Sequence, residues 1–306
     1  MTPEQHSQTA DPHARGGRPM VHRHALINGV RLHYVDYGSG PLVVLLHGFP
    51  EFWYAWRYQI PALAEAGYRV IALDQRGYNT SDKPIGVSHY RLELLVEDVR
   101  GLIAAAGESR AVVVGHDWGG AIAWSFAMRY PEWVHKLVIL NAPHPRRFLD
   151  ALSSFDQLRR SWYIALFQLP WLPEWLIRAG DYARLEHMLR NDPLRPGAFD
   201  EATLKQYKQA LAQPGALTAA LNYYRAALRC NRAELQRSIR RIDTPTLLIW
   251  GEQDRYLGPQ LAEGLADWVP NLSVERVADA SHWVHAEVPD RVNALMLNFL
   301  KGQSVA

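Results

Sequence analysis

Cysteine is nearly absent from the sequence, since the 306-residue chain has only Cys230, which has no partner for a disulfide within the chain. Nothing therefore implies an oxidising compartment. Long apolar runs are also missing: no stretch of about 18 apolar residues occurs, which argues against a membrane-spanning helix. Residues 1–20 lack the apolar run of a signal peptide. We predict that these residues form a disordered tail and that the protein is cytoplasmic.

An excess of charge of one sign is also missing. The 33 lysines and arginines nearly balance 31 aspartates and glutamates, and the formal net charge is +2. This balance does not favour nucleic acid or an anionic membrane as a partner, and no basic stripe with interleaved aromatic residues is present. Histidines and cysteines show no metal-ligand spacing, so we expect neither a metal nor another cofactor.

Short runs of valine, isoleucine and leucine recur along the chain and predict a mostly parallel sheet. They do not alternate with polar residues, which is typical of strands buried on both faces. The runs are residues 42–46, 68–73, 111–114, 136–140, 246–250 and 272–277. Ahead of them, residues 22–28 and 30–36 alternate around Asn28-Gly29 and predict an antiparallel edge hairpin. Helices are predicted over residues 92–106 and 119–129.

Alternating strands and helices indicate a doubly wound α/β sheet, but the alternation stops between residues 143 and 242. This stretch has no strand pattern, and its helical pieces are bounded by prolines. It is too long for a plain loop. We predict that residues 21–143 and 242–306 form one core, into which residues 144–241 are inserted as a helical cap.

The stretch from Gly115 to Gly119 carries the strongest chemical signal. It joins a predicted strand to a predicted helix, and its glycines flank the position where esterases of this architecture carry serine. Asp117 stands there instead, and a carboxylate is a nucleophile at neutral pH without help from a base. Attack on a saturated carbon would give an alkyl-enzyme ester. The N–H groups of Trp118 and Phe49 are the expected oxyanion donors. An isolated aspartate here would more often cap the helix.

An acid after a later strand and a histidine after the last strand complete this pattern. Asp254 and His282 occupy these positions. Asp254 should accept a hydrogen bond from one ring nitrogen of His282, which leaves the other nitrogen to deprotonate water. Glu252 is the alternative acid, whereas Asn141, at the competing position after an earlier strand, carries no charge. Position in the fold selects His282 among the 13 histidines.

Other histidines lie near these segments. His47 and His116 border the predicted site, and we assign both to loop scaffolding, in which a ring N–H bonds a backbone carbonyl. For His135, His144 and His285 we find no comparable argument from position.

Together, these segments resemble the α/β-hydrolase epoxide hydrolases. The resemblance extends from about residue 22 to the C-terminus. The stretches that carry it are His47-Gly48-Phe49-Pro50, Trp53 with Trp56-Arg57, Asp74-Gln75-Arg76-Gly77-Tyr78, the Gly115–Gly120 turn, Asn141-Ala142-Pro143-His144-Pro145 and Ser281-His282-Trp283. It implies the α/β-hydrolase fold and the hydrolysis of an epoxide to a vicinal diol.

The resemblance also implies two tyrosines of the cap that donate hydrogen bonds to the epoxide oxygen. Residues 161–168 are similar to the first such segment and place Tyr163 in this role. Residues 222–225 are similar to the second and place Tyr224, with Tyr223 as the alternative. Ring opening produces an alkoxide, which two phenols can stabilise and protonate. Tyr224 also falls on an apolar stripe at helical spacing, so packing is the competing interpretation.

An aromatic pocket is expected, and with it a small apolar epoxide as the substrate beside water. The predicted lining residues are Phe49, Trp53, Trp118, Trp162 and Phe167. The sequence leaves open whether the protein is a monomer or a homodimer.

Two other functions compete with epoxide hydrolysis. A haloalkane or haloacid dehalogenase of the same fold also uses an aspartate nucleophile. However, haloalkane dehalogenases commonly show asparagine where Phe49 stands, and fluoroacetate dehalogenases commonly show arginine where Trp118 stands. The second alternative is a non-catalytic ligand-binding protein on a hydrolase scaffold, against which the complete set of Asp117, Asp254 and His282 argues.

Overall fold

The structure is a computed structural model that describes residues 20–151 and 155–302. The predicted tail therefore lies outside the described residues, except for Met20. That side chain is buried beside the first strand, with 1% of its surface exposed.

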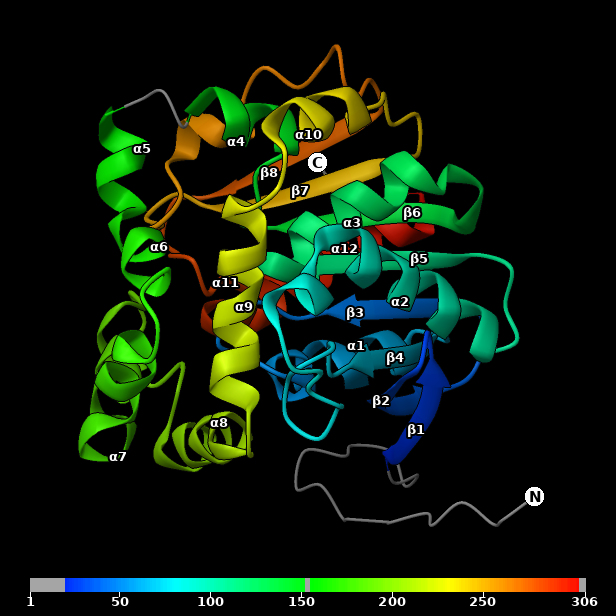
Figure 1. The fold of residues 1–306 in the computed structure, drawn as a ribbon. Coiled ribbons are helices and arrows are strands. Elements are labelled where there is room, and N and C mark those ends of the chain that lie inside the picture. Colours follow the sequence, from blue (N-terminus) through cyan, green and yellow to red (C-terminus); the bar gives the residue numbers. More distant parts are fainter. Residues whose placement is uncertain (1–19, 152–154, 303–306) are drawn as a thin grey trace.

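An eight-stranded sheet forms the centre of the molecule (Figure 1). Its order is β1-β2-β4-β3-β5-β6-β7-β8. The strands are β1 (Val21–Ile27), β2 (Val30–Gly38), β3 (Leu42–Leu46), β4 (Arg69–Leu73), β5 (Ala111–His116), β6 (Val134–Leu140), β7 (Thr246–Gly251) and β8 (Leu272–Val277). Strand β2 pairs with both β1 and β4, and both of these pairs are antiparallel. The remaining pairs in the sheet are parallel. The predicted α/β fold with its edge hairpin is thus confirmed.

Burial along the strands follows their place in the sheet. Every residue of β3, β5 and β7 is buried, as expected for strands covered on both faces. The prediction of two buried faces is wrong for β8. This strand lies at the edge, and its Val274 side chain is 38% exposed.

Helices cover both faces of the sheet. In Figure 1, α2 (Leu92–Ala105) and α3 (Trp118–Arg129) lie in front of it, and α1 (Gln59–Glu65) and α12 (Pro289–Lys301) lie behind. Short helices join the other elements: η1 (Trp53–Trp56), η2 (Val87–Tyr90), η3 (Pro131–Trp133), η4 (Pro259–Ala262) and α11 (Val284–Glu287). The arrangement is that of a doubly wound sheet.

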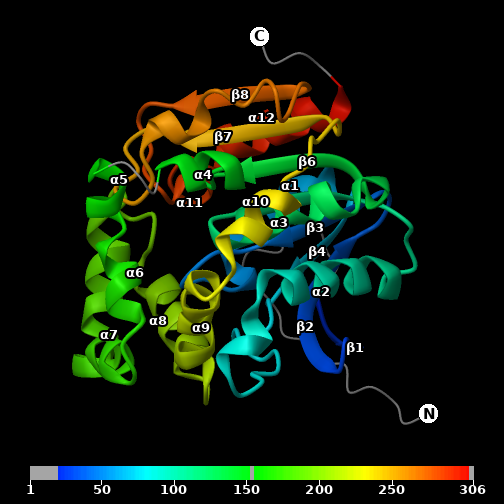
Figure 2. The ribbon, with the colours of Figure 1, turned by 45° about the horizontal axis from the view of Figure 1, so that its top comes forward.

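Between β6 and β7, the described residues form helices and no strand. The helices are α4 (Pro145–Ala151), α5 (Phe155–Arg160), α6 (Trp162–Phe167), α7 (Leu172–Asn191), α8 (Glu201–Ala212), α9 (Ala216–Leu228) and α10 (Arg232–Ser238). Figures 1 and 2 show α5 to α9 standing as a separate layer beside one end of the sheet. This end carries the carboxyl ends of the parallel strands, where loops of α/β proteins build their sites.

A buried arginine connects three of these helices. The guanidinium of Arg225 in α9 pairs with Glu174 of α7 at 2.8 Å (Nη1 to Oε1). It also donates to the carbonyl oxygens of Phe167 at 2.8 Å and Leu169 at 2.9 Å, at the end of α6. A buried charge must be paired and hydrogen-bonded to be tolerated, and Arg225 meets both conditions. It therefore fixes α6, α7 and α9 relative to one another.

Among the residues described, no helix has both the length and the apolar character needed to cross a membrane.

Candidate active site

The turn between β5 and α3 presents Asp117 in a conformation that L-residues rarely adopt, with φ 50° and ψ −119°. The flanking glycines make this turn possible. A Cβ atom on Gly115 would collide with the Gly119 carbonyl, and one on Gly119 would collide with the Leu46 carbonyl of β3. The chain packs too closely here for any larger residue, which leaves the Asp117 side chain at the carboxyl edge of the sheet.

The two carboxylate oxygens of Asp117 have different partners. Oδ1 accepts a hydrogen bond from the Phe49 N–H at 2.9 Å. Oδ2 lies 3.7 Å from Nε2 of His282, and 18% of the side chain is exposed. One oxygen is thus held by a backbone donor, while the other faces the predicted base.

Asp254 and His282 lie together as predicted. Nδ1 of His282 is 2.7 Å from Oδ2 of Asp254, and both side chains are buried. Burial alone would raise the pKa of Asp254, but the charge of His282 and its hydrogen bond hold it below the usual range. Burial alone would lower the pKa of His282, but the carboxylates of Asp254 and then Asp117 raise it to about 9. Nδ1–H therefore donates to Asp254, and Nε2 points toward Asp117.

Asn141 contributes to this geometry in a way that the sequence analysis missed. Its amide nitrogen donates to Oδ2 of Asp254 at 2.8 Å, and its amide oxygen accepts from the Gly251 N–H at 2.9 Å. An amide at the carboxyl end of β6 thus orients the acid that follows β7. Glu252, the alternative acid, pairs instead with Arg276 at 3.0 Å.

The predicted tyrosines Tyr163 of α6 and Tyr224 of α9 meet at a ring-centroid distance of 5.9 Å. The Tyr224 ring also packs against Phe49 at 5.4 Å and Trp118 at 5.1 Å. Burial and then the negative charge of Asp117 raise the pKa of both tyrosines, so their phenols are protonated at neutral pH.

The neighbouring Tyr223 faces elsewhere. Its hydroxyl donates to the Arg76 carbonyl at 2.7 Å, and its ring packs on Tyr78 and Tyr90. Successive residues on a helix point about 100° apart, so only one of the two adjacent tyrosines can face Asp117. The structure places Tyr224 there.

Comparisons with known proteins agree with the observed fold and identify the family. Residues 41–289 match the family model for the alpha/beta hydrolase fold. Human epoxide hydrolase 4 is 40% identical over 285 residues, which cover 90% of this chain and 77% of the human protein. The chain belongs to the α/β-hydrolase fold epoxide hydrolase family.

Two further proteins are similar to this chain over most of its length. The AB hydrolase superfamily protein YfhM of Bacillus subtilis is 46% identical over 279 residues, or 90% of this chain and 96% of that protein. The crystal structure of a Bacillus megaterium epoxide hydrolase in complex with an inhibitor has a TM-score of 0.84 and 35% identity. That match covers 91% of this chain and all of the other. Overall similarity to epoxide hydrolases thus extends over nearly the whole chain.

The predicted aromatic lining of this epoxide hydrolase family member divides into two groups. Phe167 packs against Phe49 at 5.8 Å and against both tyrosines, so it lies at the site. Trp162, one residue before Tyr163 on α6, is 65% exposed and therefore faces solvent. Trp53 packs instead on His22 and Tyr54, at 5.3 and 5.5 Å. These contacts do not support a pocket role for Trp162 or Trp53.

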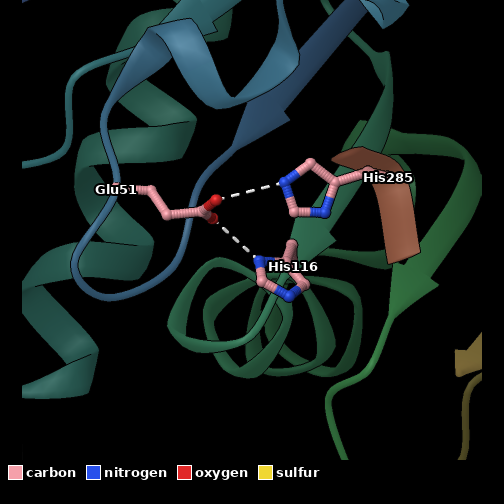
Figure 3. Close-up of side chains that lie close together, drawn as sticks. All are labelled: Glu51, His116 and His285. Carbon is pink, nitrogen blue, oxygen red and sulfur yellow. Dashed lines mark hydrogen bonds and ion pairs between the residues drawn. The ribbon is translucent and has the colours of Figure 1, made fainter. Parts of the chain in front are cut away.

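Behind the site lies a buried cluster of Glu51, His116 and His285 (Figure 3). Oε2 of Glu51 is 2.8 Å from Nδ1 of His116, and Oε1 is 3.1 Å from Nε2 of His285. All three side chains are fully buried. Their wide separation in the sequence explains why no ligand-like spacing revealed the cluster. The donor set would also suit a divalent cation, but these distances are those of direct hydrogen bonds.

His47 and His116 both contact backbone carbonyls, in agreement with the predicted scaffolding role. Nδ1 of His47 is 2.9 Å from the Gly48 carbonyl, and Nε2 accepts from the Gln75 N–H at 3.1 Å. Nε2 of His116 lies 2.9 Å from the carbonyl oxygen of His282. The contact between His116 and His282 connects the buried cluster directly to the residue predicted as the base.

Proposed function

We propose that this protein hydrolyses an apolar epoxide to a vicinal diol through a covalent ester on Asp117. The observation that carries the proposal is the position of one carboxylate between a histidine–aspartate pair and two protonated phenols, of which Tyr224 is buried and Tyr163 is half-buried. Nε2 of His282 lies 3.7 Å from Asp117 on one side. On the other side, the Tyr224 ring packs against Phe49 at 5.4 Å and Trp118 at 5.1 Å, the two residues next to the Asp117 carboxylate, and Tyr163 packs against Tyr224 at 5.9 Å. The negative charge of Asp117 also contributes to the raised pKa of both tyrosines.

In the first step, Oδ2 of Asp117 attacks an epoxide carbon, and the bond from that carbon to the ring oxygen breaks. Oδ1 is the less suitable nucleophile, because the Phe49 N–H already binds it at 2.9 Å. Tyr163 and Tyr224 donate hydrogen bonds to the departing oxygen, and one of them supplies its proton. The product of this step is a hydroxyalkyl ester of Asp117.

In the second step, Nε2 of His282 takes a proton from water while that water attacks the Asp117 carboxyl carbon. Oδ1 becomes the oxyanion, and the N–H groups of Phe49 and Trp118 are the donors we assign to it. The bond between the carboxyl carbon and the alkyl oxygen then breaks, and the alkyl oxygen takes the proton that remained on the attacking water, which releases the diol and restores the Asp117 carboxylate. The proton on His282 returns through solvent to the phenolate left by the first step, so both the imidazole and the phenol are regenerated.

Formation of the ester also prepares the base. The charge of Asp117 is among the causes that raise the pKa of His282 to about 9. Because the ester is neutral, this cause disappears when Asp117 is alkylated. The imidazole then loses its proton more readily, at the stage when a neutral base is required.

The organisation of the chain fits this scheme. We infer that residues 21–143 and 242–306 form the catalytic core, and that residues 144–241 form a cap that supplies the two phenols. Phe49, Trp118 and Phe167 surround them with apolar surface, which favours an apolar substituent on the epoxide. A Bacillus megaterium epoxide hydrolase variant has been solved with its product (R)-3-[1]naphthyloxy-propane-1,2-diol, so the matching glycidyl ether is a suitable probe. The cytoplasmic location stays a prediction.

The test is to trap the ester. His282→Ala should still be alkylated but should not hydrolyse the ester, so mass spectrometry should find one epoxide mass added to a peptide containing Asp117. Asp117→Asn is the control and should show no adduct. A panel of simple haloalkanes, assayed for chloride release, should give no product. Diol formation without any adduct on Asp117 would refute the covalent route, and chloride release without diol formation would favour the dehalogenase.

A further inference from the structure

Three histidines lie together on one face of the β1–β2 hairpin, outside the candidate active site. His22 and His24 alternate along β1 and therefore point to the same side. In the register of the hairpin, His24 lies directly opposite His33 of β2. Arg23, between the first two, points to the other face, where it pairs with Asp36 at 3.2 Å. The strand alternation thus brings three imidazoles together at the edge of the sheet.

The three rings are close enough for their nitrogens to share one ion. Nδ1 of His22 is 2.9 Å from Nε2 of His33, with the ring centroids 5.1 Å apart and the planes 19° from parallel. These two nitrogens therefore meet edge to edge, with a proton on one of them. The ring centroid of His24 lies 5.0 Å from that of His33, and His24 is exposed. Rotation of the His24 side chain can therefore bring one of its nitrogens to the same point.

A buried carboxylate fixes the orientation of His33. Nδ1 of His33 is 2.6 Å from Oδ2 of Asp74, whose side chain is completely buried. An ionised carboxylate can only accept, so Nδ1–H donates to Asp74 and Nε2 faces His22. Asp74 itself accepts from the Trp53 N–H at 2.9 Å and from the Asn79 amide at 2.7 Å. Histidines that bind metals commonly donate their other N–H to a carboxylate in this way.

We propose that His22, His24 and His33 form a binding site for a divalent transition-metal ion such as Zn²⁺. Three neutral imidazoles are a donor set that holds Zn²⁺, with water in the fourth position. Zinc–nitrogen bonds of about 2.0–2.1 Å in a tetrahedron place two ligating nitrogens about 3.3 Å apart. The 2.9 Å contact between His22 and His33 needs to open by only about 0.4 Å to reach that separation. The ion takes the place of the proton between these two rings.

Access and charge also favour this site. Because His24 is exposed, an ion reaches the three rings directly from solvent. Arg31 is the remaining charged side chain on this face of β2, and its guanidinium lies 3.9 Å from Asp82. The Asp74 carboxylate behind His33 offsets part of the charge of the ion. The sequence analysis expected no metal, because the third ligand comes from the next strand and only the hairpin register brings it to the other two.

A bound ion would strengthen the edge of the sheet. Strand β1 is the outermost strand, and in the described sheet it pairs only with β2. The three histidines would join these two strands through the ion, and Asp74 would connect them to the loop after β4. An ion that binds only the folded chain stabilises it by mass action. The expected role is structural, since none of these residues belongs to the proposed catalytic set.

The first test titrates the untagged, full-length protein with Zn²⁺ at about pH 8, where exposed histidines are neutral. Calorimetry should show one Zn²⁺ bound per chain, and saturation should raise the Tm by about 3 to 6 °C. His22→Gln and His24→Gln should each weaken Zn²⁺ binding at least about tenfold. His89→Gln is the matched control, because His89 is also exposed but lies outside the hairpin, and it should bind Zn²⁺ like the wild type.

The second test locates the ion on the wild-type protein by NMR with ¹⁵N-labelled histidine. Zn²⁺ should shift the signals of Nδ1 of His22 and Nε2 of His33, together with one nitrogen of His24. The signals of His116 and His285 should stay unchanged, because the buried cluster behind the active site is an alternative set of ligands for the same ion. This measurement needs no variant, so it stands even if a substitution disturbs folding.

Absence of Zn²⁺ binding to the wild-type protein would overturn the proposal. So would binding that is unchanged in both His22→Gln and His24→Gln, or NMR shifts confined to the buried cluster. Thermal unfolding without Zn²⁺ shows whether each variant is folded. Neither test depends on epoxide turnover, so the metal site and the proposed function can fail independently.

Discussion

The candidate site is built from two regions that fix their side chains in different ways. The region at the sheet edge holds Asp117, Asp254 and Asn141 by directed hydrogen bonds, several of them from backbone N–H groups. The helical region holds Tyr163 and Tyr224 by ring packing against each other and against Phe167. The side chains whose hydrogen bonds require a strict geometry are thus located at the edge of the rigid sheet. The side chains held by apolar packing are located on the helices. The following experiments test this division.

The largest effect is expected from the acid of the sheet edge. In Asp254→Asn, the His282 pKa should fall below about 9, because the Asp254 carboxylate is the main cause that raises it. Loss of the orienting carboxylate should also slow ester hydrolysis by about 10⁴-fold. Single-turnover kinetics and histidine NMR measure the two changes. If hydrolysis keeps the wild-type rate, the sheet edge does not orient the base through Asp254.

The two tyrosines of the helical region should affect the other step. Tyr163→Phe combined with Tyr224→Phe should slow alkylation by about 10²- to 10³-fold, because the developing alkoxide loses its donors. Tyr223→Phe is the matched control on α9. It removes a hydrogen bond to the Arg76 carbonyl and should cost about 1 kcal/mol of stability, with little change in alkylation rate. A stronger kinetic effect from Tyr223 than from Tyr224 would reverse the assignment.

The ionisable groups of the sheet edge also predict how stability depends on pH. The Asp254 pKa is lowered, so its contribution is present above the unfolded value near 4 and is lost as pH falls further. The His282 pKa is raised to about 9, so its contribution is complete below the unfolded value of 6.5 and is lost as pH rises through 9. Urea unfolding from pH 3 to pH 10 should therefore show an acid decline below about pH 4 to which Asp254 contributes and an alkaline decline between about pH 6.5 and 9 to which His282 contributes.

His282→Gln serves as the control for this profile. It should flatten the decline between pH 6.5 and 9, because glutamine does not titrate. An unchanged alkaline decline in this variant would assign it to another group.

The smallest effect is expected from the outer side of α6. Trp162→Ala should change stability by no more than about 0.5 kcal/mol, because the side chain is 65% exposed. Phe167→Ala on the same helix should cost about 3 kcal/mol and weaken binding of apolar epoxides, because it removes a buried ring at the site. Thermal unfolding and KM measurements compare the two. A larger effect from Trp162 would mean that the outer side of α6 is covered by a partner.

Prediction from the sequence worked best where one local pattern determines the structure. The apolar runs predict the strands, and their order brings Asp117, Asp254 and His282 to one edge, since parallel strands end there together. The sequence could not reveal Glu51 and His285 as neighbours of His116, because only the complete fold brings the three together.

Helical faces were harder to predict than strand ends. Trp162 was predicted to line the pocket, but adjacent positions on a helix point in different directions, and Tyr163 takes the inner one. Choosing between Tyr223 and Tyr224 likewise required the position of α9 relative to the sheet. The lack of charge on Asn141 argues only against its being the acid, since an amide is well suited to fix a carboxylate by donating to it.

The position of Arg225 directly after Tyr224 has a mechanical consequence. Its guanidinium fastens the end of α6 and Glu174 of α7 to α9, so a buried ion pair adds to the ring packing that joins the helices carrying the two phenols. If these helices move when a substrate enters, Tyr163 and Tyr224 should therefore move together. An arriving epoxide oxygen would then meet both hydroxyls at their native spacing, without a search for the second one.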